Sequence, residues 1–445
     1  MNFTENLPKK NLYLLSLGCT KNLVDSEVML KDLDKDYVLS DDISSADLLI
    51  VNTCGFIQSA KEESINALLD LHEKRKKSSI LVMAGCLSQR YKEELKEELK
   101  EVDIFTGVGD YDKIASLVKS KTNAFSEKVF LNEKKANRVI SGSNYHAYVK
   151  ISEGCNQACA FCAIPSFKGK LNSRSLESIE EELKDLVTRG FYDFSFIAQD
   201  SSSYLKDKEQ NDGLVLLISM VEKIAGIKSA RILYLYPKTT SLDLIKKIQD
   251  SKIFHNYFDI PLQHSSQKIL KDMKRPDKQN KTRILLEAMK GTKDAFIRST
   301  FIVGFPNESE EDFKELCDFV KEFEFSRANV FCFSAEEGTS ASLSAGQISS
   351  EISEKRAEIL GEIIEKIYLK NLEAQVGKII NIVVDGASSE HEYLLSAKEL
   401  CWAPEIDGEI YVNDKEISEE IIFGKIYKAK ITELSGKKLL ATVIA

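Results

Sequence analysis

The pattern of apolar and charged positions from residue 11 to about residue 120 is that of repeated β-α units. Three apolar runs are typical of buried strands in a parallel sheet: Asn11–Leu17, Ala46–Val51 and Ser79–Met83. Helical periodicity lies between and after them, at Leu23–Lys35, Gln58–Lys77 and Lys92–Val102. We therefore predict an α/β domain with a parallel sheet over residues 1–125.

A second series of strands and helices follows a polar, lysine-rich linker, which we place at residues 126–140. Its predicted strands are Ala147–Ser152, Asp193–Ala198, Ser229–Tyr234, Tyr257–Ile260, Phe296–Val303 and Ser326–Phe333. Six repeats are too few for a closed (βα)8 barrel. The pattern therefore predicts a partial (βα)6 barrel over residues 141–370, from which a helix at Ile352–Gln375 leads out.

The last part of the chain changes to short strands separated by turn residues. They are expected at Lys378–Asp385, Glu392–Lys398, Glu409–Asn413, Lys425–Glu433 and Leu439–Ala445. Five strands in about seventy residues predict a small OB-like β-barrel over residues 371–445.

Composition narrows the class of protein. Apolar residues make up 43% of the 445 residues, and no apolar run approaches the length that spans a bilayer. The net charge of −9 argues against a protein that coats a polyanion. No signal peptide is recognised, so we expect a cytoplasmic protein whose nine cysteines are reduced. Such thiols serve as metal ligands, nucleophiles or core residues.

Three cysteines share one tight loop after the strand at Ala147–Ser152. Cys155, Cys159 and Cys162 form a CxxxCxxC motif that contains Phe161. Three thiolates can bind three irons of a 4Fe-4S cube and leave the fourth iron open to a substrate. Zinc prefers four ligands, and no partner pair is evident near this loop.

Three further cysteines each end a predicted strand of the first domain. Cys19, Cys54 and Cys86 lie 35 and 32 residues apart, but the carboxyl ends of parallel strands meet at one edge of a sheet. A single cysteine there would be read as a small buried residue. Three in matching places predict a second cluster with three thiolate ligands. Cys317, Cys332 and Cys401 show no such arrangement and are assigned to structure.

The segments around these cysteines resemble the methylthiotransferase family of radical S-adenosylmethionine (SAM) enzymes, whose C-terminal module is the TRAM domain. The resemblance runs in order along essentially the whole chain. Its main segments are LGCTKNLVDSE at 17–27, NTCGFI at 52–57, AGCLSQRY at 84–91, KISEGCNQACAFCAIPSFKGK at 150–170, AQDSSSY at 198–204, DIPLQHSS at 259–266 and IRSTFIVGFPNE at 297–308. The first segment and AQDSSSY favour the members that modify ribosomal protein S-twelve.

The resemblance implies two 4Fe-4S clusters and SAM in two roles. Cys155, Cys159 and Cys162 would hold the cluster that cleaves SAM to a radical, and the strand-end cysteines would hold an auxiliary cluster that delivers sulfur. A second SAM would supply the methyl group. The target would be the β-carbon of an aspartate, whose hydrogen is too weakly acidic for a side-chain base, so radical chemistry fits. Reduced flavodoxin or ferredoxin is the expected electron donor, and no catalytic residue is assigned beyond the cluster ligands.

Phe161 of the cysteine loop and residues near strand ends of the partial barrel are expected to contact SAM. The residues near strand ends are Gln199, Asp200, Gln263, His264 and Arg298. Phe161 fits equally beside adenine or in the core, and His264 is more typical of a structural histidine than of a metal ligand. Arg298 stands at the start of its strand, which makes its assignment weaker.

The charge of the tail bears on the choice of substrate. Residues 371–445 carry 8 basic and 13 acidic side chains, a net charge of −5. Such a module is expected to repel tRNA and attract a basic ribosomal protein. The alternative is that its surface charge has no functional role. Trp402 either anchors the substrate or plugs the barrel. The rival hypotheses are a methylthiotransferase acting on an anticodon-adjacent adenosine of tRNA, and a non-catalytic iron–sulfur or zinc protein that binds ribosomes.

Overall fold

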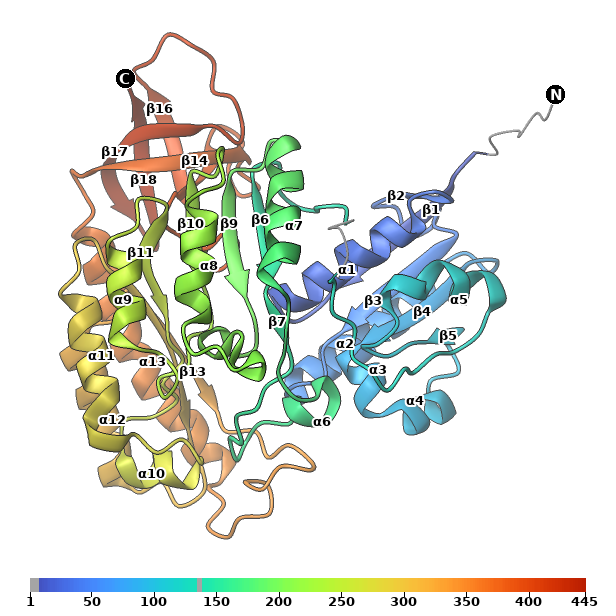
Figure 1. Ribbon diagram of the computed structural model, residues 1–445, viewed down its shortest axis with the longest axis horizontal. Coiled ribbons are helices and arrows are strands. Elements are labelled where there is room, and N and C mark those ends of the chain that lie inside the picture. The colour runs from blue at the N-terminus through green and yellow to red at the C-terminus, as the bar shows by residue number, and fades with distance from the viewer. Residues whose placement is uncertain (1–7, 134–137) are drawn as a thin grey trace.

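The computed structural model describes residues 8–133 and 138–445. Figure 1 shows an N-terminal α/β unit beside a larger middle unit, with a β-barrel at one end of the middle unit. No helix in the described residues is long and apolar enough to cross a membrane.

The N-terminal unit is a parallel five-stranded sheet with the strand order β2-β1-β3-β4-β5. The strands are β1 Lys10–Ser16, β2 Tyr37–Leu39, β3 Leu48–Thr53, β4 Ile80–Gly85 and β5 Ile104–Phe105. The helices are α1 Thr20–Leu33, α2 Gln58–Lys74, α3 Cys86–Arg90, α4 Lys92–Glu98 and α5 Ile114–Ser120. On β3, Leu48 and Ile50 belong to one core cluster, and Leu49 and Val51 belong to another. Both faces of this sheet are therefore buried, which explains its unbroken apolar runs.

The prediction of a parallel N-terminal sheet is confirmed, with two differences. Strands β2 and β5 were not predicted, because they have only three and two residues and show no period. The helix expected over Lys92–Val102 ends at Glu98, and the chain then turns into β5. Part of the expected linker packs against the N-terminal unit, since the backbone N–H of Phe130 donates to the carbonyl of Val108 at 3.0 Å.

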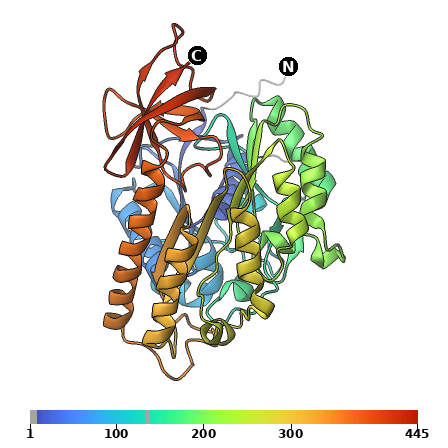
Figure 2. The same cartoon turned by 90° about the vertical axis from the view of Figure 1, so that its left-hand side faces the viewer.

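The middle unit is an open sheet of six parallel strands in the order β13-β12-β11-β10-β9-β6. Its strands are β6 His146–Lys150, β9 Asp193–Ile197, β10 Ser229–Ile232, β11 Phe254–Asp259, β12 Phe296–Val303 and β13 Arg327–Cys332. Its larger helices are α7 Leu176–Thr188, α8 Gly213–Val221, α9 Leu242–Gln249, α10 Gln267–Asp272, α11 Lys281–Lys290, α12 Glu310–Phe323 and α13 Ser350–Glu373. Figure 2 shows these helices along the outside of the sheet. The predicted partial barrel is confirmed.

Two short strands lie between β6 and α7, and a barrel follows the last repeat. The strands β7 Ser152–Glu153 and β8 Asn172–Ser173 pair with each other and flank the cysteine loop and helix α6 Ile164–Lys168. The predicted five-stranded C-terminal barrel is confirmed, and its strands close in the order β14-β15-β16-β18-β17. Its strands are β14 Ile379–Ala387, β15 Leu395–Glu399, β16 Ile410–Lys415, β17 Ile426–Ser435 and β18 Lys438–Ile444.

The barrel packs against the amino ends of the middle strands. Tyr257 donates a hydrogen bond from its hydroxyl to Asp407 at 2.8 Å, and Arg231 donates to the carbonyl of Leu400 at 2.9 Å. Trp402 is buried in the core cluster of the barrel, so it serves as the plug. The carboxyl ends of the middle strands are therefore left to face the N-terminal unit.

A buried arginine joins the N-terminal and middle units. Arg138 contacts Glu27 of α1, and its Nε lies 2.7 Å from Oε1 of Glu182 on α7. All three side chains are at most 4% exposed. Removing one partner of such a group leaves uncompensated charge in the interior, which costs far more than the loss of a surface pair.

We expect Arg138→Met to lower the free energy of unfolding by about 3–5 kcal/mol, because it leaves Glu27 buried without a cation and leaves Glu182 with Arg174 alone. Arg189→Met removes a surface arginine whose Nη1 lies 3.3 Å from Asp185, and should cost under about 1 kcal/mol. Urea unfolding of both variants measures the difference. Equal losses would show that the buried group does not hold the units together.

Candidate functional site

All six motif cysteines line one cavity of about 450 Å³ between the N-terminal and middle units. Cys19 immediately precedes α1, Cys54 follows β3, and Cys86 begins α3 directly after β4. The other three cysteines come from the loop between β7 and α6. The two sets, which we name the strand-end trio and the loop trio, thus face a common space.

The strand-end trio is held together by one asparagine. Asn22 is 1% exposed, and its Nδ2 donates to the carbonyls of Leu17 and Thr53 at 3.0 and 3.1 Å. Its Oδ1 lies 3.7 Å from Sγ of Cys86. The asparagine therefore contacts the ends of three successive parallel strands, which explains why distant cysteines converge.

A glycine lets two of these strand ends approach each other. Gly18 has φ +87°, and a Cβ added there would lie 2.6 Å from Cβ and 2.7 Å from Sγ of Cys54. Gly55 is similarly close, because an added Cβ would lie 2.8 Å from the backbone of Leu87. The space beside these cysteines is thus kept clear by residues that have no side chain.

The loop trio is fixed by backbone contacts and one arginine. The backbone N–H of Gln157 donates to Sγ of Cys155 at 3.4 Å, and Ala160 donates from its N–H to the carbonyl of Met273 at 2.9 Å. Arg275 donates from Nη1 to Sγ of Cys159, also at 3.4 Å. The loop trio therefore has a guanidinium in direct contact with one of its sulfur atoms.

Burial makes most of these thiols poor acids on their own. It raises the pKa of Cys86 and Cys162 to about 12 and that of Cys155 to about 11, and it also raises the pKa of Cys54. A bound cation reverses this effect, because coordination stabilises the thiolate. The cavity wall therefore suits metal-bound sulfur.

The kind of metal group follows from spacing. In residues 8–133 and 138–445, no three His, Cys, Asp or Glu side chains are placed to hold a single metal ion. A four-iron cube instead spreads its cysteine ligands over separate irons. The three cysteines of each trio and the space that the glycines leave clear would provide the ligands and the room for such a group.

A buried ion group lies behind the cavity and contains Asp25, Lys150, Glu153 and Lys168, each at most 3% exposed. Lys168 lies 3.5 Å from both carboxylates. Burial tends to raise the pKa of Glu153, but the charges of Lys150 and Lys168 outweigh it and lower the pKa to about 2. Glu153 also accepts a hydrogen bond from Nε2 of Gln199. The group keeps the cysteine loop tied to α1.

Four of the six residues predicted to contact SAM line the cavity: Phe161, Gln199, Asp200 and Gln263. Asp200 accepts hydrogen bonds from Nε2 of Gln157 at 2.9 Å and from Oγ of Ser203 at 2.6 Å. Gln263 has φ 75°, a conformation in which a side chain other than glycine is strained.

The other two predicted residues lie elsewhere. His264 is 1% exposed, with Nε2 3.2 Å from Glu308 and Nδ1 accepting from the N–H of Ser266, so it is a structural histidine. Arg298 lies 3.9 Å from Asp407 of the barrel loop, away from the cavity. Arg298 lies near the amino end of β12, the end that faces the barrel, and His264 lies in the loop five residues beyond the end of β11.

Several residues of the cavity wall were not predicted. They are Lys21, Asn22, Phe56, Gln157, Ile164, Phe167, Lys168, Tyr234, Leu235, Tyr236, Pro261, Arg275 and Phe331. Lys21 and Asn22 follow Cys19 by two and three positions, and this proximity was a usable signal. Arg275 is 116 residues from Cys159, and no local pattern connects them.

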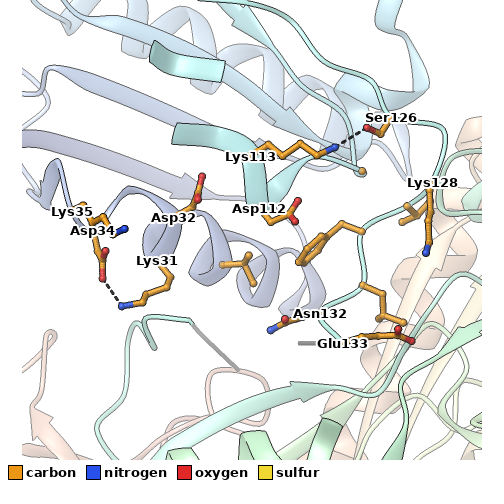
Figure 3. A pocket seen from close by; sticks show the side chains of 15 residues that line it. Lys31, Asp32, Asp34, Lys35, Asp112, Lys113, Ser126, Lys128, Asn132 and Glu133 are labelled. Carbon is orange, nitrogen blue, oxygen red and sulfur yellow. Dashed lines mark hydrogen bonds and ion pairs between the residues drawn. The ribbon is translucent and has the colours of Figure 1, made fainter. Parts of the chain in front are cut away.

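A larger hollow of about 830 Å³ lies on the N-terminal unit between α1 and residues 126–133 (Figure 3). Three of its eight labelled charged residues form ion pairs: Lys31 lies 2.6 Å from Asp34, and Lys113 lies 2.8 Å from Asp110. None of its lining residues is a cysteine or a histidine. The hollow therefore lacks the chemistry of the cysteine cavity.

Family models match three consecutive parts of the chain. The model described as uncharacterized protein family UPF0004 matches residues 11–107, the radical SAM superfamily matches 149–320, and the TRAM domain matches 376–444. The radical SAM match implies a 4Fe-4S cluster and SAM, and the first model suggests an auxiliary cluster.

Curated relatives match over the full length. "Ribosomal protein uS12 methylthiotransferase RimO" of Aliarcobacter butzleri is 59% identical over 446 residues and covers 100% of both chains. The protein of the same name from Campylobacter jejuni is 55% identical over 433 residues, 97% of this chain and 98% of the relative.

Two solved structures share the fold at low identity. The radical SAM methyltransferase TsrM from Kitasatospora setae has a TM-score of 0.55 and 12% identity, over 73% of this chain and 75% of its own. The cobalamin-dependent radical enzyme OxsB has a TM-score of 0.52 and 13% identity, over 80% of this chain and 56% of its own. These likenesses concern the fold alone.

The thiol pKa values predict a pattern of alkylation in metal-free, reduced protein. At pH 8 a thiol with a pKa of about 12 is ionised to about one part in ten thousand, so Cys86 and Cys162 should react with iodoacetamide more slowly than exposed Cys332. Their rates should rise about tenfold per pH unit. Peptide mass spectrometry at pH 7, 8 and 9 measures this, and equal rates for all three cysteines would contradict it.

Proposed function

Since the chain belongs to the ribosomal protein uS12 methylthiotransferase (RimO) family and is a radical SAM methylthiotransferase, we propose that it attaches a methylthio group to the β-carbon of an aspartate of uS12. One observation carries the proposal: both cysteine trios line the same cavity, so a substrate atom can meet both centres without leaving the enzyme. A ribosomal substrate also places the enzyme in the cytoplasm.

In this proposal the loop trio holds a 4Fe-4S cluster and the strand-end trio holds an auxiliary 4Fe-4S cluster. With SAM bound, these groups supply the one-electron chemistry, the sulfur and the methyl group that an unactivated carbon requires. The chain's own residues would orient SAM and the substrate and shield them from water. Phe161, Gln199, Asp200 and Gln263 form the wall beside the loop trio, where SAM would bind. Phe56, Phe167 and Phe331 make the wall apolar, which limits water and side reactions.

The C-terminal barrel supports a protein substrate over tRNA. Its charge of −5 repels phosphates and attracts a basic ribosomal protein. Mass spectrometry of uS12 and of tRNA from a deletion strain separates the two substrates. Loss of the methylthio group from tRNA while uS12 keeps its own would overturn the proposal.

Reduced flavodoxin or ferredoxin is the electron donor that we propose, and the surface beside the loop trio supports an acidic partner. Residues 268–283 carry seven basic and two acidic side chains in a chain of net charge −9. A groove of about 550 Å³ is lined there by Lys238, Arg275, Lys278 and Lys281. Arg275 contacts Cys159, so a donor in this groove sits close to the loop trio.

The two trios predict separable losses in anaerobically reconstituted protein. Cys159→Ala should abolish SAM cleavage, whereas Cys54→Ala should leave SAM cleavage intact and stop sulfur insertion into a uS12 peptide. Each variant should hold about four irons instead of about eight. The control is exposed Cys332→Ala, which should keep wild-type iron and activity. If both trio variants still made product, or if zinc without sulfide were found, the assignment would fail.

The basic groove predicts a donor-specific defect. Lys238→Glu with Lys278→Glu should slow turnover driven by reduced flavodoxin about tenfold at low salt, because charge steering is lost, and leave dithionite-driven turnover unchanged. Lys184→Glu with Lys366→Glu changes charge equally at exposed sites elsewhere and should do little. A defect that appears only with assembled ribosomes would assign the groove to ribosomal RNA instead.

A further inference from the structure

The cavity contains a buried ammonium group that lacks an acidic partner. Lys21 is 9% exposed and lines the cavity beside the strand-end trio. In the parts of the chain that the structure describes, Lys21 forms no ion pair: no carboxylate oxygen lies within 4.0 Å of its Nζ. An ammonium buried without an anion is costly, so its retention calls for a ligand.

The surroundings of Lys21 hold it in place without neutralising it. Its Nζ lies 3.3 Å from the centroid of the Tyr234 ring, a cation–π contact. Tyr234 has φ 63°, and its backbone N–H donates to Asp259 at 3.0 Å. Asp259 thus accepts a hydrogen bond from this backbone amide and forms no ion pair with Lys21.

The other cations of the cavity wall are already engaged. Lys168 lies 3.5 Å from both Asp25 and Glu153. Arg275 donates to Sγ of Cys159 and to the carbonyl of Pro261 at 2.7 Å, and it stacks on Tyr236 with 4.2 Å to the ring centroid. Lys21 is therefore the wall cation left for an incoming anion.

We propose that Lys21 binds the side-chain carboxylate of the substrate aspartate. This inference rests on the proposed function and deepens it. The carboxylate carbon is bonded directly to the β-carbon that is modified, so an anion held at Lys21 brings that carbon into the cavity. Lys21 follows Cys19 in the chain and packs on Tyr234 just beyond β10 of the middle unit, so the anion site lies between the two units. A neutral side chain would leave the ammonium unpaired, which makes Lys21 a specificity-determining residue.

The test compares variants and substrates in reconstituted full-length enzyme. Lys21→Met keeps the length of the side chain and its apolar contact, and Lys21→Arg keeps the charge. With a uS12 peptide, Lys21→Met should raise KM about tenfold to a hundredfold, because a charge-assisted hydrogen bond is lost. Iron content, SAM affinity and SAM cleavage without peptide should stay at wild-type levels, and Lys21→Arg should recover part of the affinity.

A peptide with asparagine in place of the target aspartate supplies the second readout. Wild type should bind the aspartate peptide more tightly than the asparagine peptide, and Lys21→Met should lose this preference. Weaker SAM binding with unchanged peptide affinity would assign Lys21 to the cofactor's carboxylate, and loss of iron would assign it to the cluster; either result overturns the inference, as does an unchanged preference. If wild type itself leaves uS12 unmodified but modifies tRNA, the proposed function fails and the inference fails with it.

Discussion

Buried charges must be matched, and this constraint decides how the two α/β units meet. Asp25 and Glu27 of α1 face cations that belong to the other side of the interface, Lys150 of β6 and Arg138. Each group is buried, so separating the units would leave charges of both signs in an apolar surface. The interface is therefore fixed in position, and the cavity that it encloses has a defined shape.

Much of the fold follows from patterns that a single sequence displays. The unbroken apolar run at β3 reflects a sheet that is buried on both faces. The six repeats of the middle unit reflect a parallel sheet that is covered by helices. The convergence of Cys19, Cys54 and Cys86 follows from a general property of parallel sheets, which is why it was predictable across a separation of 67 residues.

What the sequence could not predict depends on side-chain direction and on contacts between distant segments. His264 and Arg298 stand near strand ends, yet one pairs with Glu308 and the other faces the loop of the barrel. Lys21 and Arg275 belong to the cavity only because α1 packs on the middle sheet and residue 275 folds back on the cysteine loop. Such placements arise from tertiary packing between distant segments, which leaves no periodic pattern in the local sequence.

The size of the shared cavity limits what can enter it. A volume of about 450 Å³ bounded by cysteines from two units has room for small groups and one protruding side chain, but not for a helix or a strand of a partner. The target residue must therefore stand on an exposed bend of its own protein and reach inward. Selection among the many aspartates of a ribosome is then made by local protrusion as well as by charge, and aspartates on flat surfaces are rejected by shape alone.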